Sequence, residues 1–158
     1  MPLTRDEDIV RLLTNARTIA VVGASDRPSR PSHGVMKFLQ DWGYRVIPVN
    51  PQITGEHVLG EFVWRELPQI GVPIDIVDIF RRPEAAAEAV EQAIFVGAKA
   101  VWMQIGVINE EAAAKAEAAG LEVVMDRCPK IEIPRLGIPS RHRERDHAEH
   151  GGGGVVQD

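Results

Sequence analysis

The residues best suited to hold an anion lie in the loop 23–34, GASDRPSRPSHG. Gly23 suits a tight turn after a β-branched run, and Ser32 is a plausible cap for the helix that follows. Backbone N–H groups at such a helix entrance can bind phosphate. The dinucleotide-binding fingerprint needs a second glycine where this chain has Ser25, and its third glycine is displaced to Gly34. The loop therefore indicates either a phosphate site or an ordinary strand-to-helix turn without a ligand.

Four arginines add positive charge near the same prospective site. Arg27 and Arg30 lie in this loop, and Arg81 and Arg82 follow the apolar run IDIVDIF. Guanidinium groups bind phosphates through paired hydrogen bonds, so four of them around one crevice would suit a ligand with several phosphates. The alternative is that the first pair is solvated and the second pair contacts nearby acids such as Glu84.

The elements that must position these residues alternate between strand and helix. Short apolar segments predict strands at residues 18–22, 45–49, 74–80, 100–105 and 121–125, and segments with helical apolar spacing separate most of them. Strands separated by helices form a parallel sheet through right-handed crossovers, with helices on both faces. We therefore expect a three-layer, Rossmann-like α/β fold, a doubly wound parallel sheet of about five strands in the order 3-2-1-4-5.

In such a sheet the ligand crevice lies at the carboxyl ends of the strands, where the winding direction reverses beside strand one. The loops expected to meet there are 23–33, 50–53, 80–83 and 104–107. Phe80, at the end of the third strand, could stack on an adenine, although a phenylalanine at a strand end is more often part of the core.

Composition narrows the class of protein. The chain has 158 residues, a net charge of −5 and one cysteine, so we expect one domain over residues 1–140 without disulfides or a multi-cysteine metal site. The charge argues against nucleic acid or anionic membrane as partners. No signal segment or membrane-length apolar run is apparent, and we expect a cytoplasmic protein. Residues 141–158, with four consecutive glycines, are expected to form a disordered tail.

Four stretches, in order, resemble the CoA-binding domain family of small bacterial proteins. They are IAVVGASDRPSRPSHGVMKFLQDWGYRVIPVNP, VDIFRRPE, AVWMQIGV and VVMDRCPKIE, and the resemblance covers about residues 5–138. The chain is more distantly similar to the N-terminal CoA-binding domain of the succinyl-CoA synthetase alpha subunit. The resemblance implies a Rossmann-like domain that holds coenzyme A as its cofactor.

The resemblance also implies which residues bind coenzyme A. Carried over motif by motif, they are Gly23, Ala24, Ser25, Asp26, Arg27, Asn50, Pro51, Phe80, Arg81, Arg82, Gln104 and Ile105. The synthetase subunit has a lysine after its second strand where this chain has Gln52 and Ile53, so arginines elsewhere must meet the phosphate charge. The phosphorylated histidine of the synthetase belongs to a second domain that this sequence does not show, so acyl-phosphate chemistry is not expected.

Two other functions compete with passive binding of coenzyme A or an acyl-CoA. An NAD(P)-dependent oxidoreductase would share the fold, but an NAD site places an acid at the end of strand two, where this chain has Asn50 followed by Pro51. A regulatory module that senses coenzyme A and acts through a protein partner is equally compatible with the residues. We expect a binding protein without catalysis, with no catalytic residues and no metal. Cys128, the only thiol, could form a mixed disulfide with coenzyme A if it faced the crevice, but a small buried residue is the simpler expectation.

Overall fold

A computed structural model describes residues 1–140 of the chain, and the expected tail at 141–158 lies outside the described residues. Within them, no helix is long and apolar enough to cross a membrane. The elements in chain order are α1 (Asp6–Asn15), β1 (Thr18–Val22), α2 (Pro31–Asp41), β2 (Arg45–Val49), β3 (His57–Val58), β4 (Glu61–Phe62), η1 (Leu67–Gln69), β5 (Ile76–Ile79), η2 (Pro83–Ala85), α3 (Ala86–Phe95), β6 (Ala100–Met103), α4 (Glu110–Ala118), β7 (Glu122–Val124) and α5 (Pro129–Arg135).

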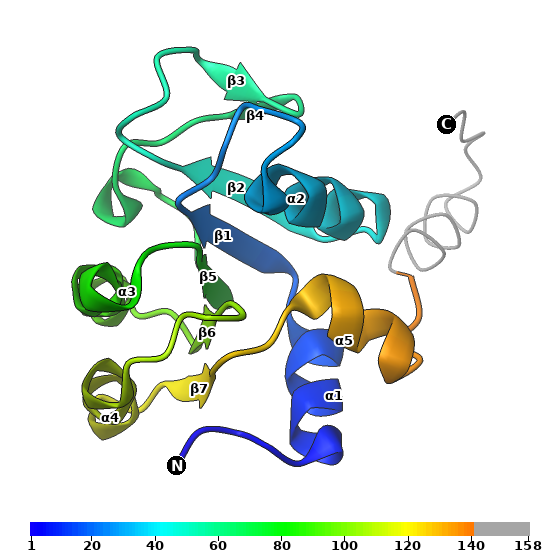
Figure 1. Ribbon diagram of the computed structural model, residues 1–158, viewed down its shortest axis with the longest axis vertical. Coiled ribbons are helices and arrows are strands. Elements are labelled where there is room, and N and C mark those ends of the chain that lie inside the picture. The colour runs from blue at the N-terminus through cyan, green and yellow to red at the C-terminus, as the bar shows by residue number, and fades with distance from the viewer. Residues whose placement is uncertain (141–158) are drawn as a thin grey trace.

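Five of these strands form one parallel sheet in the order β2-β1-β5-β6-β7, with helices packed on both faces (Figure 1). The predicted α/β fold class, with its five parallel strands, is confirmed. Val22 pairs with Val49 on one side and with Ile79 on the other, so β1, β2 and β5 end at the same level. The loops that follow these three strands therefore begin side by side at the carboxyl edge of the sheet.

The predicted strand order of 3-2-1-4-5 is wrong. The third strand of the sheet along the chain, β5, pairs with β1 rather than with β2. The outer side of β2 is already occupied by the segment after β4, because Trp64 donates its backbone N–H to Pro48 O (3.0 Å) and accepts from Asn50 N–H (2.9 Å). The chain then returns on the other side of β1. The winding direction consequently reverses between β1 and β5, and the crevice lies there.

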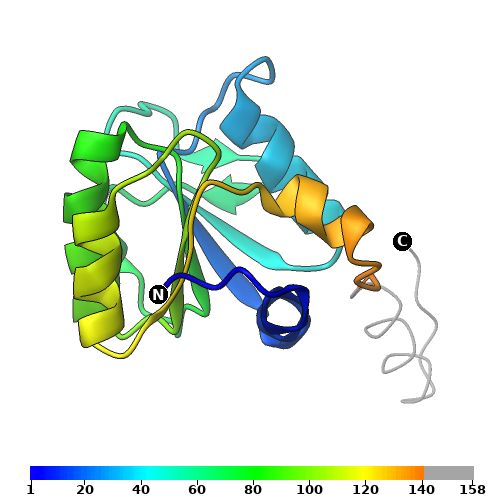
Figure 2. The ribbon, with the colours of Figure 1, turned by 60° about the horizontal axis from the view of Figure 1, so that its bottom comes forward.

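Each face of the sheet has its own apolar core. On one face α1, α2 and α5 cover Ile19 and Val21, and on the other α3 and α4 cover Ala20 and Val22 (Figures 1 and 2). Because both faces are covered, successive strand residues are apolar without alternation. The core therefore holds β1 rigidly, and the loops at its carboxyl end extend from a fixed base.

Candidate functional site

The turn after β1 requires a glycine. Gly23 has φ +87°, and a Cβ at this position would lie 2.0 Å from Phe80 O. Its N–H donates to Val49 O (2.9 Å), so the turn is held between the ends of β2 and β5. No other residue fits so close an approach of two backbones. The first loop thus leaves the sheet at the point where the winding direction reverses.

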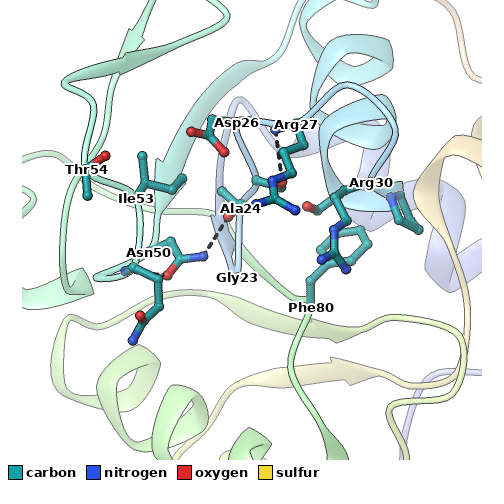
Figure 3. Close-up of a pocket in the computed structure, with 13 residues that line it drawn as sticks. Gly23, Ala24, Asp26, Arg27, Arg30, Asn50, Ile53, Thr54 and Phe80 are labelled. Atoms are coloured by element: carbon teal, nitrogen blue, oxygen red, sulfur yellow. Dashed lines mark hydrogen bonds between the residues drawn. The ribbon is translucent and has the colours of Figure 1, made fainter.

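A cleft of about 530 Å³ opens at this point, and we call it the polar cleft (Figure 3). In Figure 3, Arg30 and Phe80 lie on one side of it, and Ile53 and Thr54 lie on the opposite side. Its lining residues are Gly23, Ala24, Ser25, Asp26, Arg27, Arg30, Pro31, Ser32, Asn50, Gln52, Ile53, Thr54 and Phe80. The structure therefore brings together the predicted residues of the first loop, Asn50 and Phe80.

Asn50 joins the first two loops of the site. Its Nδ2 donates to Ala24 O (2.7 Å), and its Oδ1 accepts from Gln52 N–H (2.8 Å). The guanidinium of Arg65 donates to Ile53 O and to Pro51 O, and these hydrogen bonds hold the loop after β2. An NAD site carries a ribose-binding acid at the end of strand two. In this protein Asn50 takes that position, and its side-chain amide already forms hydrogen bonds within the protein.

The N-terminus of α2 differs from the expectation that Ser32 caps the helix. Arg30 is the N-cap residue and Pro31 takes the first helical position, so Ser32 lies inside the first turn. Proline at the first helical position was the signal in the sequence that could have placed the start correctly. Ser32 is only 5% exposed and lines the polar cleft, and its hydroxyl makes no hydrogen bond with any residue in 1–140. A buried hydroxyl without a partner is costly, and a ligand oxygen would satisfy it.

The four arginines are divided between two cavities. Arg27 and Arg30 line the polar cleft, whereas Arg81 and Arg82 line a second cavity of about 620 Å³. The two pairs of arginines therefore do not line a single cavity. The two cavities adjoin, because Phe80 and Pro31 line both of them.

None of these four arginines forms an ion pair within residues 1–140, so the alternative pairing of Arg81 and Arg82 with nearby acids does not occur there. By contrast, Arg135 contacts both Asp6 (2.8 Å) and Glu132 (2.7 Å). In an acidic protein, positive charge without an internal partner at one edge is available to an anionic ligand.

Gln104 and Ile105 line the second cavity, together with Cys128, whose thiol is free and mostly buried. The Gln104 amide nitrogen donates to both oxygens of Asp78 (2.9 and 3.2 Å) when the amide is oriented to satisfy its neighbours. Asp78 lies on β5 with no solvent exposure, and this burial raises the pKa of its carboxyl well above the ordinary value.

The remaining predicted residue, Pro51, lies outside both large cavities and lines a small one of about 40 Å³. Sequence reasoning did not assign Pro31, Gln52, Ile53 or Thr54 to the site, although it placed most of their loops at the crevice. Which side chains of a loop face inward depends on the Asn50 and Arg65 contacts, which no local pattern reveals. No group of three or more potential metal ligands occurs in the described part of the chain.

The parallel sheet, the winding reversal and the glycine turn against β5 define a Rossmann-like α/β domain with a crevice at its carboxyl edge. A family model described as a CoA binding domain matches residues 17–134. The chain belongs to this family, as the resemblance in the sequence predicted.

Relatives span nearly the same length as this chain. An uncharacterized protein, YneT, of Bacillus subtilis strain 168 is 44% identical over 124 residues, which are 78% of this chain and 90% of YneT. The solved structure of a hypothetical protein from Pyrococcus horikoshii OT3 has a TM-score of 0.81 and 45% identity over 86% of this chain and 96% of that chain.

A more distant likeness is confined to the fold. An apo acetyl-coenzyme A synthetase from Ca. Korarchaeum cryptofilum has a TM-score of 0.65 and 21% identity, over 74% of this chain and 28% of that chain.

Proposed function

We propose that this protein binds coenzyme A, one molecule per chain, in the polar cleft and the adjoining second cavity, without catalysing a reaction of its own. The observation that carries the proposal is the set of four arginines without ion-pair partners in residues 1–140, along one edge of an acidic protein. Coenzyme A has a pyrophosphate and a separate 3′-phosphate, so two separated pairs of guanidiniums match its two anionic groups. Membership of the CoA binding domain family supports the same ligand.

Each part of the polar cleft then has a role. Arg27 and Arg30 supply charge to one phosphate group, and the Ser32 hydroxyl, which lacks a protein partner among the described residues, supplies a hydrogen bond. Arg81 and Arg82 meet the other phosphate group from the second cavity. Charge-assisted hydrogen bonds of this kind are stronger than neutral ones, so a few of them can hold a soluble anion.

Binding without catalysis is favoured by the chemistry of the lining. Apart from its two arginines, the polar cleft has one ionisable side chain, that of Asp26. The polar cleft lining holds no histidine, lysine or cysteine that could serve as a general base or as an activated nucleophile. The same lining disfavours a nicotinamide cofactor, because Asn50 stands where the ribose-binding acid belongs.

The test is isothermal titration calorimetry of the purified protein with coenzyme A, NAD and NADP. We expect coenzyme A to bind one to one with a Kd of about 1 μM or below, and both dinucleotides to bind at least about tenfold more weakly. Mass spectrometry of small molecules that co-purify with the native protein gives an independent readout. Equal or tighter binding of NAD would overturn the proposal.

A further inference from the structure

The second cavity differs in character from the polar cleft. Besides Arg81, Arg82 and Gln104, its walls include Val35, Ile105, Val107, Cys128 and Ile131. We call this group of five residues the apolar lobe. No carboxylate lines the second cavity, and its volume of about 620 Å³ lies within the range of small-molecule sites.

Two isoleucines of the apolar lobe are left open to solvent. Ile105, in the loop after β6, is 59% exposed, and Ile131, on α5, is 53% exposed. Large apolar side chains that gather around a cavity indicate a site that is covered when a ligand binds. Both residues come from segments that the sheet topology brings to the carboxyl edge, so they face the same ligand crevice.

The second cavity adjoins the polar cleft, because Pro31 and Phe80 line both of them. One ligand can therefore have its charged part in the polar cleft and an apolar part in the lobe. Arg81 and Arg82 follow Phe80 directly in the chain and, of these two cavities, line only the second. Coenzyme A is charged at its nucleotide end, and acyl groups are carried at its opposite, thiol end.

We infer that the apolar lobe binds the acyl chain of an acyl-CoA and that the protein prefers acylated coenzyme A to the free thiol. The inference rests on the proposed function, since coenzyme A itself must first bind at this edge of the sheet. The preferred chains are aliphatic and uncharged, because the exposed walls of the lobe offer aliphatic carbon from Ile105 and Ile131.

The experiment is calorimetry with coenzyme A and a series of S-alkyl-CoA thioethers carrying two to eight carbons, which cannot be hydrolysed. A fully buried methylene contributes about 0.8 kcal/mol, or roughly a fourfold gain in affinity. Allowing for partial burial in an open lobe, we expect S-hexyl-CoA to bind at least about tenfold more tightly than coenzyme A.

Two matched variants locate the effect. Ile131→Asn places a polar side chain in the lobe and should flatten the dependence of affinity on chain length. Ile108→Asn is the control, because Ile108 is similarly exposed at 49% and belongs to the loop after β6, but it does not line the cavity. The control should keep the full dependence. Both positions are half-exposed, so both variants should fold, which circular dichroism checks.

The outcomes separate the two proposals. If coenzyme A itself does not bind, both the proposed function and the acyl preference are wrong. If coenzyme A binds but all chain lengths bind equally, the acyl preference is wrong while the proposed function stands. A chain-length dependence that persists in Ile131→Asn would also overturn the assignment of the acyl chain to the lobe.

Discussion

At the scale of single residues, Arg81 and Arg82 carry the most direct prediction about binding. They have no ion-pair partner within residues 1–140 and line the second cavity. The double variant Arg81→Ala with Arg82→Ala should weaken coenzyme A by about ten- to a thousandfold, since a hydrogen bond to a charged group contributes about 1.5 to 3 kcal/mol. Calorimetry measures the change.

Two controls sharpen this result. The control variant Arg17→Ala with Arg45→Ala removes two positive charges at the amino ends of β1 and β2. Its affinity for coenzyme A should stay within about twofold of that of the natural protein, because exposed charges beyond a Debye length are screened. Dephospho-CoA, which lacks the 3′-phosphate, identifies the phosphate group that Arg81 and Arg82 contact. If the double variant no longer prefers coenzyme A over dephospho-CoA, the arginines contact the 3′-phosphate. If its affinities for both ligands fall equally, they contact the pyrophosphate. Unchanged affinity for both ligands would remove these arginines from the site.

Asp78 carries a prediction about stability and pH. Burial raises the pKa of its carboxyl, so the folded protein holds this proton more tightly than the unfolded chain does. The group therefore contributes stability below the ordinary aspartate pKa of about 3.9, and that contribution is lost as the pH rises through the higher folded-state pKa.

Asp78→Asn cannot ionise and keeps a carbonyl that can accept from Gln104. Relative to the natural protein, the variant should gain stability as the pH rises from about 4 to about 8, by about 1.4 kcal/mol for each unit by which folding raises the pKa. Urea unfolding at several pH values measures the difference. A difference that stays constant over this range would contradict a raised pKa.

At the scale of elements, the N-terminus of α2 is the part of the fold that most resembles a prepared anion site. Ser32→Ala removes a buried hydroxyl that has no partner in the described residues. The variant should have the same free energy of unfolding as the natural protein. It should bind coenzyme A about tenfold more weakly, because the hydroxyl forms its hydrogen bond only when the ligand is present. Thermal unfolding and calorimetry together distinguish these effects.

Ser29→Ala is the matched control for this prediction. Ser29 is an exposed serine of the same loop and does not line either large cavity. It should change neither the unfolding free energy nor the affinity. A Ser32→Ala protein that loses stability without losing affinity would show that the hydroxyl serves the fold rather than the ligand.

At the scale of the whole molecule, coenzyme A should stabilise the entire domain. The cavities are bounded by the loops after β1, β2, β5 and β6 and by α5, so a bound ligand connects segments from much of the chain. At a free concentration of about 100 Kd the ligand adds about 2.7 kcal/mol, which should raise the Tm by about 5 to 10 °C for a chain of this size.

Differential scanning fluorimetry with coenzyme A, NAD and NADP checks this expectation. Coenzyme A should shift the Tm, whereas NAD and NADP at the same concentration should shift it by much less. Shifts of equal size for all three ligands would indicate a general nucleotide effect.

The sequence alone determined the class of fold, most strand positions and the loops that border the site. Segments 18–22 and 45–49 match β1 and β2, because parallel strands covered on both faces appear as short continuous apolar runs. The family resemblance named the first loop, Asn50 and Phe80, which line the polar cleft. Such features are local in the chain, and local patterns are what a sequence records directly.

Only the tertiary structure decided the strand order and the shape of the site. The backbone hydrogen bonds of Trp64 to Pro48 and Asn50 occupy the outer edge of β2. No sequence pattern within β5 indicates that this strand pairs with β1 instead. The same holds for Phe80, which lines both cavities, and for Ser32, whose hydroxyl lacks a partner among the described residues. These properties depend on contacts between residues far apart in the chain, so they exist only once the strands have assembled.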